Sequence, residues 1–255
     1  MSRIEVTDLS KCFGTKTVLD HVSFQVEDGE FLSILGPSGC GKTTILRILI
    51  GLLEPTTGTI RKDGADITSV SPDQRGMGIV FQNYALFENM TVLKNVEYAL
   101  RFRKETKGQA RETAENLIRR VGLWEQRDKK PGKLSGGQQQ RVAIARTLAL
   151  KPDMILFDEP MSALDVDTRL ALRKELKDIQ KEFGTTMVYI THDQEEAFAM
   201  SDRIMVMEEG KIHQIGTPEE IVEKPADDYV RRFVLENLQI KVDSLSRFIR
   251  AEEKR

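Results

Sequence analysis

A glycine-rich stretch at residues 36–43 constrains this chain more than any other feature. It follows an apolar run at residues 31–35, which predicts a buried strand, and precedes one at residues 44–50, which predicts a buried helix ending at Gly51. Glycines let successive backbone N–H groups turn toward an anion, and the helix N-terminus adds unsatisfied donors. Lys42 can then reach nucleotide phosphates and the Thr43 hydroxyl can ligate Mg²⁺. A chance match is on the order of one in a hundred from average composition, so a tight turn with a surface lysine is disfavoured. The full stretch is Gly36-Pro37-Ser38-Gly39-Cys40-Gly41-Lys42-Thr43.

Composition and charge narrow the class of protein. The chain has 255 residues, a net charge of −2 and two cysteines, Cys12 and Cys40. This charge predicts no strong attraction to nucleic acid or anionic lipid. The cysteines favour a reducing compartment and give no metal or disulfide framework, and Cys40 is best explained as a small filler in the loop. No signal peptide begins the sequence and no apolar run approaches about 18 residues, so we expect a soluble, cytoplasmic protein.

Residues 1–82 predict short strands on both sides of this loop. Alternating apolar residues between Ile4 and Val26 indicate a β-rich opening, residues 57–64 have the pattern of a hairpin, and residues 77–81 resemble a buried strand. Gln82 follows that strand, where parallel α/β folds place ligand contacts. Phe13 lies in the opening sheet, and its spacing fits equally a core ring and an exposed platform for a nucleotide base.

Helix-forming sequence takes over in residues 91–150. Apolar residues recur at helical spacing, which predicts a helical subdomain inserted into an α/β body. Near its end, residues 134–138 read Leu-Ser-Gly-Gly-Gln and open a helix at residues 139–150. This second Ser- and Gly-rich helix N-terminus is a potential anion site. Ser135 with Gln138 three residues later is equally the pattern of a simple capping box.

Two carboxylates close the next apolar strand, at residues 154–159. In nucleotide-hydrolysing proteins with such a loop, an Asp in the position of Asp158 holds Mg²⁺. A second carboxylate beside it, Glu159, suits polarising a water molecule. A helix is expected from residues 162–165 through about residue 183. A buried strand at residues 185–190 then leads to His192, which is either structural or a candidate contact for a γ-phosphate.

The last fifty residues predict a hairpin and further helices. Residues 204–207 and 211–215 are expected to pair as strands, and residues 218–235 to form a helix opening at Pro218. Residues 236–255 place Leu238, Val242, Leu245 and then Phe248 or Ile249 at spacings of three and four, which predicts an amphipathic helix. We expect it to dock on the chain's own surface, with self-association or partner contact as the alternative. The predicted division is thus a domain at residues 1–235 and a tail at residues 236–255.

Taken together, these motifs resemble the nucleotide-binding subunit of ATP-binding cassette (ABC) transporters over roughly residues 3–235. Residues 36–43 match the Walker A motif, and residues 134–138 match the family signature without change. Gln82 corresponds to the Q-loop, residues 162–165 to the D-loop, and His192 to the switch histidine. Asp158 and Glu159 match the Walker B aspartate and the catalytic glutamate. Because no motif departs from the pattern, the resemblance implies an active ATPase.

The resemblance also implies a fold, ligands and site residues. The fold is an α/β P-loop NTPase core with an N-terminal antiparallel β-subdomain and the inserted helical subdomain. ATP and Mg²⁺ are the implied ligands, with Glu159, His192 and Gln82 in catalysis and Thr43, Gln82 and Asp158 at the metal. The implied nucleotide-binding residues are Phe13, Gly36, Pro37, Ser38, Gly39, Cys40, Gly41, Lys42, Thr43, Thr44, Ser135, Gly136, Gly137, Gln138 and Asp165.

Partners follow from the same resemblance. Two such subunits, identical or paralogous, pair head to tail on binding ATP, so that each ATP lies between one chain's Walker A motif and the other's signature. The pair works with transmembrane permease subunits at the inner face of the cell membrane, together with an extracytoplasmic solute-binding protein. We expect the membrane subunit to dock around residues 82–92, where Tyr84 and Phe87 suggest an exposed aromatic cluster.

Residues 84–92 and 216–221 are similar to those of bacterial importers for polyamines, sulfate, phosphonates, iron or sugars. Many of that branch carry a further regulatory β-domain of about a hundred residues, which this sequence does not contain. Alternatives are an export ATPase, an ABC ATPase acting on DNA or ribosomes, and a regulatory module that holds ATP without turnover. A single cassette, about 90 residues between the two glycine motifs, and intact Glu159 and His192 disfavour the last two. The sequence does not name the cargo.

Overall fold

The computed structural model describes residues 3–103, 106–162, 164–240 and 242–244. Its strands form two sheets, one antiparallel and four-stranded, the other mixed and six-stranded. The strands are β1 (Ile4–Phe13), β2 (Lys16–Val26), β3 (Phe31–Leu35), β4 (Thr57–Lys62), β5 (Ala65–Asp66), β6 (Met77–Val80), β7 (Met154–Asp158), β8 (Thr186–Thr191), β9 (Arg203–Glu208) and β10 (Lys211–Gly216).

The helices occupy the segments between these strands and follow the last of them. The α-helices are α1 (Lys42–Leu49), α2 (Val92–Glu97), α3 (Ala110–Arg120), α4 (Gly136–Leu148), α5 (Val166–Phe183), α6 (Gln194–Met200), α7 (Pro218–Glu223) and α8 (Asp228–Val230). Short 3₁₀ turns lie at Pro72–Gln74, Ala99–Phe102, Lys107–Gln109, Trp124–Gln126 and Pro131–Lys133, and a π-helical segment spans Arg231–Glu236. Within the described ranges, no helix has both the length and the apolar character needed to cross a membrane.

The six-stranded sheet sets the position of the site. Its order is β10-β9-β3-β8-β7-β6, with β3 parallel to β8 and β9, and β7 parallel to β8 and β6. Every residue of β3 and β8 is buried, as expected for parallel strands covered on both faces. The carboxyl ends of β3, β7 and β8 therefore lie at one edge, and the glycine loop, Asp158 and His192 follow them there.

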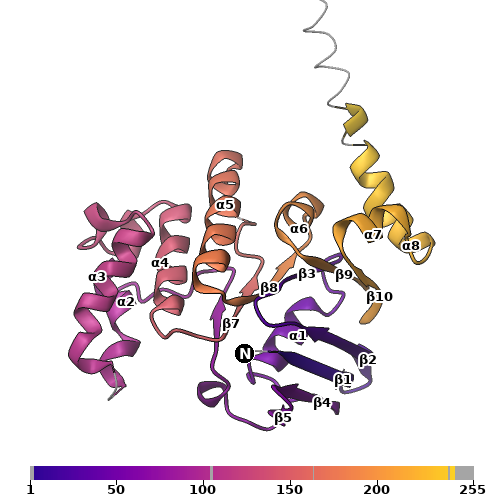
Figure 1. Cartoon of the computed structure of the whole chain (residues 1–255), viewed down its shortest axis with the longest axis horizontal. Helices are drawn as coiled ribbons and strands as arrows, with labels where there is room; N and C mark the ends of the chain where they lie inside the picture. Colours follow the sequence, from indigo (N-terminus) through magenta and orange to yellow (C-terminus); the bar gives the residue numbers. More distant parts are fainter. Residues whose placement is uncertain (1–2, 104–105, 163, 241, 245–255) are drawn as a thin grey trace, which may run out of the picture.

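Separate apolar clusters fill the spaces around this sheet. One joins the four-stranded sheet to α1 and to one face of β3, β7 and β8, and a second packs α4 and α5 on the opposite face. A third lies almost entirely among α2, α3 and α4. Figure 1 shows these three helices at one end of the molecule, with the four-stranded sheet well apart from them at the bottom of the view. The mixed α/β architecture with a predominantly antiparallel first sheet confirms the predicted fold class.

The carboxyl-terminal part differs from the prediction of one helix at residues 218–235. Helix α7 ends at Glu223, and Lys224 has φ −137° and ψ 65°, because a residue that precedes proline, here Pro225, is disfavoured from the helical region. A new helical turn starts where the Asp227 side chain accepts a hydrogen bond from the Val230 amide at 2.8 Å. Helix α6 was not predicted at all; the Asp193 side chain caps its first turn.

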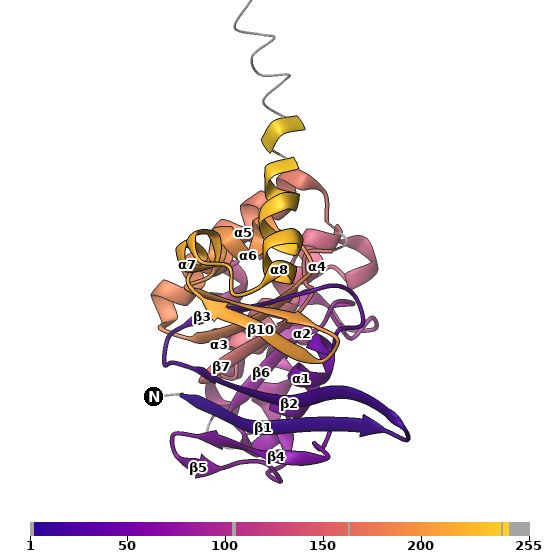
Figure 2. The same cartoon turned by 90° about the vertical axis from the view of Figure 1, so that its right-hand side faces the viewer.

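The predicted tail helix lies only partly within the described residues. Residues 237–240 and 242–244 are helical, and Leu238 packs against the apolar cluster beneath α7 and α8. Ile240 and Val242 are exposed. Figure 2 shows this segment leading away from the sheets. Leu245, Phe248 and Ile249 lie outside the described residues, so the predicted docking of the whole tail stays a prediction.

Candidate functional site

The glycine loop runs from the carboxyl end of β3 into the first turn of α1. Gly39 and Gly41 have φ of 82° and 108°, a left-handed region that glycine enters without a steric penalty. A Cβ atom at Gly41 would also lie 2.7 Å from Leu19 and 2.9 Å from the carbonyl oxygen of Val18. Strand β2 therefore lies against the loop. Gly41 is required both for its backbone conformation and for this close approach.

The loop surrounds a small depression and leaves the start of α1 uncapped. The depression has a volume of about 180 Å³. Gly41 stands at the N-cap of α1 and has no side chain to accept a hydrogen bond from the first turn. Open N–H donors at the positive end of a helix dipole favour an anion. Cys40 is 4% exposed and fills space beneath the loop, as expected. The depression is lined by Val18, Ser38, Gly39, Gly41, Lys42, Thr43, Thr44 and Glu159.

Lys42 is buried with its ammonium group against the loop. Its side chain is 4% exposed, and Nζ donates to the carbonyl oxygens of Gly36 at 2.7 Å and Pro37 at 2.9 Å. Nζ also lies 3.8 Å from Oε1 of Glu159. A buried lysine needs such partners because desolvation of an unpaired charge is costly. The cation is thus fixed between the loop and the carboxylate, facing the depression.

Thr43 and Asp158 form a pair of oxygen donors beside it. The Thr43 hydroxyl donates to Oδ1 of Asp158 at 2.9 Å. Burial raises the pKa of Asp158, and the neighbouring Glu159 charge acts in the same direction, while the Thr43 hydrogen bond opposes it. A divalent cation beside Asp158 would offset the cost of burying its negative charge next to that of Glu159. Mg²⁺ binds through one or two carboxylates plus water and phosphate oxygens, so the Thr43 and Asp158 oxygens fit it. The described residues form no group of three or more acidic, histidine or cysteine side chains that could hold a metal ion, and Mg²⁺ does not require one.

Glu159 and His192 meet at the same sheet edge. Oε2 of Glu159 lies 3.1 Å from Nδ1 of His192, whose side chain is about half exposed. Glu159 has a φ of 44°, an uncommon conformation for a residue other than glycine and one that gathers at functional sites. Its two carboxylate oxygens therefore face different groups, Lys42 on one side and His192 on the other. This arrangement can orient a carboxylate toward a water molecule next to a phosphate.

Gln82 approaches the same residues from β6. Its Nε2 donates to Oγ of Ser162 at 3.1 Å, and that hydroxyl donates to the carbonyl oxygen of Glu159 at 3.0 Å. No hydrogen bond among the described residues joins Gln82 to Thr43 or Asp158. The structure thus connects Gln82 to the backbone of Glu159, and its predicted role at the metal stays a prediction.

The signature residues lie at the N-terminus of α4. The Ser135 hydroxyl accepts from the Gln138 amide at 3.3 Å and the Gln138 side chain accepts from the Ser135 amide at 3.1 Å, so the predicted capping box is confirmed. No described contact joins residues 134–138 to the glycine loop, and α4 and α1 lie on different sides of β7 (Figure 1). Asp165 caps α5 in the same way, accepting from the Thr168 amide at 2.9 Å, which lowers the pKa of Asp165.

Phe13 is an exposed ring rather than a core residue. It is 51% exposed at the end of β1, and Nζ of Lys11 lies 5.1 Å from the ring centroid. It does not line the depression around the glycine loop. Of the two interpretations left open by the sequence, burial in the core is therefore wrong, and the platform for a base stays a prediction.

Sequence reasoning missed the residues that support His192 from behind. Arg169 donates to Oδ2 of Asp193 at 3.3 Å and to the carbonyl oxygen of Leu164 at 3.1 Å. Buried Glu196 accepts from the hydroxyls of Tyr189 and Thr191, each at 2.8 Å. These contacts join α5, α6 and β8 directly below the histidine. The only sequence signal was the pair of acidic residues after Asp193, which marks a helix start.

The expected aromatic cluster at residues 82–92 needs a correction. Tyr84 is 8% exposed and packs in the apolar cluster beneath β7, and its backbone has a φ of 61°. The exposed aromatic side chains are instead Phe87, Tyr98 and Phe102, whose successive ring centroids are 4.6 and 5.1 Å apart. Phe87 and Tyr98 line a groove of about 480 Å³ between α2, α4 and β6.

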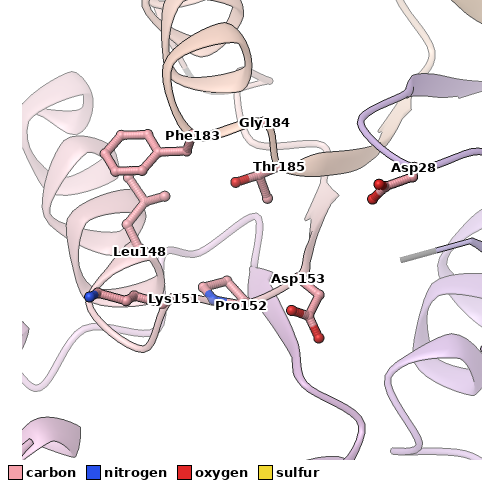
Figure 3. Close-up of a pocket in the computed structure, with 8 residues that line it drawn as sticks. All are labelled: Asp28, Leu148, Lys151, Pro152, Asp153, Phe183, Gly184 and Thr185. Carbon is pink, nitrogen blue, oxygen red and sulfur yellow. The ribbon is translucent and has the colours of Figure 1, made fainter. Parts of the chain in front are cut away.

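A larger cavity, of about 560 Å³, lies away from the predicted site. Figure 3 shows it between the ends of α4 and α5 and the turns at Asp28 and Asp153. It faces the amino ends of β7 and β8, whereas the glycine loop follows the carboxyl end of β3. Because none of the predicted site residues lines it, the small depression at the loop is the better candidate for the chemistry.

Comparison with known protein families now bears on this geometry. The family described as ABC transporter matches residues 19–162. The chain belongs to this family. It is 48% identical over 238 residues to the spermidine/putrescine import ATP-binding protein PotA of Bacillus cereus, covering 93% of this chain and 73% of the relative. It is 49% identical over 230 residues to the PotA of Oleidesulfovibrio alaskensis, covering 90% and 62%.

Among solved structures, the chain is similar to the ATP-binding cassette MJ0796, determined as a dimer in a post-hydrolysis state with ADP and phosphate bound. The TM-score is 0.75 at 34% identity, over 84% of this chain and 98% of that one. As a member of the ABC family, the chain is an ATPase that uses ATP with Mg²⁺. This conclusion agrees with the loop, the oxygen pair and the carboxylate described above.

Proposed function

We propose that this chain is the ATP-hydrolysing subunit that energises a membrane importer, and that its cargo is a polyamine of the spermidine or putrescine class. Import and cargo class are supported by the names of the PotA relatives, 48% and 49% identical to this chain. An exporter remains the second candidate left by the sequence, and no feature of the described residues favours it.

The observation that carries the proposal is the position of Glu159 between Lys42 and His192. Lys42 would neutralise the nucleotide phosphates, and Thr43 with Asp158 would hold Mg²⁺, whose positive charge would offset theirs. Glu159 accepts the proton of the attacking water, and His192 holds the carboxylate in place. Gln82 is connected to Glu159 by hydrogen bonds through Ser162. Phe13 supplies the face on which the base stacks.

A second subunit completes the site. Residues 134–138 carry N–H donors at the N-terminus of α4 but do not contact their own chain's glycine loop. In a head-to-tail pair, identical or with a paralogue, they and Asp165 face the nucleotide held by the other chain. The dimeric state of the similar cassette MJ0796 supports this arrangement. Hydrolysis removes the phosphate that both chains hold, which releases the pair because the two states differ in affinity.

The membrane subunits dock in the groove lined by Phe87 and Tyr98. Exposed aromatic rings around a hollow of about 480 Å³ fit an inserted segment of a partner protein. Permease subunits seated there hold the chain at the inner face of the cell membrane, and a solute-binding protein delivers cargo from outside.

Reconstitution tests this proposal. The chain is purified with permease subunits from its own organism, placed in vesicles, and assayed for ATP-driven accumulation of labelled spermidine or putrescine. Glu159→Gln serves as the control, since it keeps the protein's shape but removes the base. Accumulation that requires Glu159 supports the proposal. ATP hydrolysis without uptake of either polyamine would reject the cargo class, and ATP-driven efflux would reject import.

A further inference from the structure

The segment between β6 and α2 contains a backbone feature that its sequence does not explain. Tyr84 and Ala85 are consecutive residues with φ of 61° and 47°. The left-handed region is crowded for any residue with a Cβ atom, and such conformations persist only where surrounding contacts impose them. The Tyr84 hydroxyl is buried with no hydrogen-bond partner among the described residues. The tyrosine therefore does not hold the turn through its hydroxyl, and another group must.

That group is Arg146 on α4. Its Nη1 donates to the carbonyl oxygen of Ala85 at 2.7 Å, and Nη2 donates to that of Tyr84 at 3.2 Å. One guanidinium thus holds both carbonyls of the left-handed pair, a geometry that suits the planar fork of arginine and not the single ammonium of lysine. No ion pair with a carboxylate is found for Arg146 within the described ranges. Its specific polar contacts are therefore with this turn.

The same guanidinium also faces the groove. Its Cζ lies 5.5 Å from the centroid of the Phe87 ring, within cation–π range. The turn is fastened on its other side by fully buried Asn95, whose side chain accepts from the Phe87 amide at 2.8 Å and donates to the Phe87 carbonyl at 3.1 Å. Phe87 is thus held from α4 and from α2, and whatever moves its ring acts on Arg146.

The opposite end of the turn reaches the catalytic carboxylate. Gln82 precedes the left-handed pair by two residues and bonds to Ser162, which bonds to the Glu159 carbonyl. We propose that Arg146 is a positioning residue: it imposes the left-handed turn at Tyr84 and Ala85, and so couples the Phe87 groove to the placement of Gln82 next to Glu159. The effect of this turn on ATP hydrolysis rests on the proposed function, whereas the role of Arg146 in holding the turn does not.

The holding of the turn is tested by hydrogen–deuterium exchange on the purified full chain. The Tyr84 amide donates to Phe81 at 2.9 Å and the Ala85 amide to Asn83 at 2.7 Å, so both are protected only while the turn persists. In Arg146→Lys, exchange in residues 82–91 should be about tenfold faster, with residues 31–45 unchanged. Arg141→Lys is the matched control, because Arg141 lies on the same helix but pairs with Glu175 at 3.1 Å.

A second variant separates positioning from general stability. Glycine adopts the left-handed region freely, so Ala85→Gly should restore much of the protection lost in Arg146→Lys. In steady-state assays Arg146→Lys should lower kcat about tenfold and leave KM for ATP within about twofold, since Gln82 does not line the depression at the glycine loop. Ala85→Gly should recover part of that kcat.

The outcomes distinguish this inference from the proposed function. Unchanged exchange in Arg146→Lys would overturn it, as would equal effects of Arg146→Lys and Arg141→Lys, or no recovery of protection with Ala85→Gly. Normal kcat with faster exchange would overturn the link to Glu159. If the unaltered chain and its permease showed no ATP-driven uptake, the proposed function would fail, yet the exchange experiment would still decide the role of Arg146.

Discussion

Helices α1 and α4 both begin at a glycine-containing turn, but their first turns are satisfied differently. At α1 the N-cap is Gly41, which has no side chain to accept a hydrogen bond from the first-turn amides. At α4 the Ser135 and Gln138 side chains each accept from the other residue's backbone amide across the first turn. The start of α1 therefore lacks the side-chain cap that α4 has, which leaves its amides the better placed of the two for an anion. The start of α4 is a stable helix terminus that can bind an anion only by sharing donors with its own cap.

The surroundings of the two helix starts differ as well. Lys42, Asp158 and Glu159 gather at α1, so the cation and the carboxylates of the proposed site lie on that side. Neither helix has an acidic residue in its first turn, yet only α1 faces carboxylates from a neighbouring strand. In the proposed function, the α1 side contains the chemistry and the α4 side supplies donors for a phosphate. Substitutions on the two sides should separate turnover, nucleotide affinity and pairing of subunits.

The largest effect should come from Glu159→Gln on the α1 side. A carboxylate general base contributes about 10²–10⁴ in rate, and glutamine keeps the shape without accepting a proton. Lys42, Thr43 and Asp158 remain to bind MgATP, so hydrolysis should collapse while binding persists. Because the pair opens only after hydrolysis, this variant should accumulate as an ATP-bound dimer. Phosphate release and size-exclusion chromatography with MgATP measure the two effects.

The unaltered chain, isolated without membrane partners, is the control and should remain mainly monomeric. Normal hydrolysis by Glu159→Gln would remove Glu159 from its proposed role. Loss of hydrolysis without any dimer at saturating ATP would count instead against the shared site, and would leave Ser135 as a helix cap only.

Lys42→Ala should weaken ATP binding by about 10- to 100-fold, the equivalent of about 1.5–3 kcal/mol for hydrogen bonds to a charged group. The physical reason is the position of Nζ at the loop, where it faces the depression. Titration with a fluorescent ATP analogue in the presence of Mg²⁺ gives the affinity. Lys133→Ala is the matched control, since this exposed lysine beside the signature makes no ion pair among the described residues. Unchanged affinity in Lys42→Ala would contradict the assignment of the phosphate loop.

Much of the α1 side was predictable because it depends on short-range pattern. Apolar runs at β3, β7 and β8 predicted buried parallel strands, and strands of that kind bring the residues after them to one edge. Lys42, Asp158, Glu159 and His192 were therefore expected together. The Ser135 cap could likewise be predicted, because a capping box spans only four residues.

The contacts beyond this edge were not predictable, because they depend on tertiary packing. Tyr84 was expected at the surface, but its ring packs in the apolar cluster beneath β7, and its carbonyl oxygen accepts a hydrogen bond from Arg146, 62 positions later. The Phe87, Tyr98 and Phe102 rings come into contact, tilted against one another, only once α2 and the following turn pack against α4. Arg169 supports His192 from a helix whose sequence gives no sign of it. Each case requires knowing which helix faces which loop.

The smallest expected effects on the isolated chain are at Ser135, and two substitutions there separate its roles. Ser135→Ala removes the cap, which costs about 0.5–2 kcal/mol. The melting temperature should then fall by about 2–4 °C for each kcal/mol in a chain of this size. Ser135→Asp keeps an N-cap of equal rank, so its melting temperature should stay within about 1 °C of the unaltered chain. It nevertheless places a negative charge where the partner's γ-phosphate would lie.

Both variants are made in the Glu159→Gln background, where the ATP-bound dimer should accumulate. Ser135→Asp should abolish that dimer through charge repulsion, and Ser135→Ala should weaken it about tenfold by removing one hydrogen bond to a charged phosphate. ATP affinity of the monomer should not change in either, because α4 of the same chain takes no part in holding its nucleotide. A stable dimer in Ser135→Asp would mean that Ser135 only caps its helix. Loss of the dimer with an unchanged melting temperature would assign the α4 terminus a ligand as well as a cap.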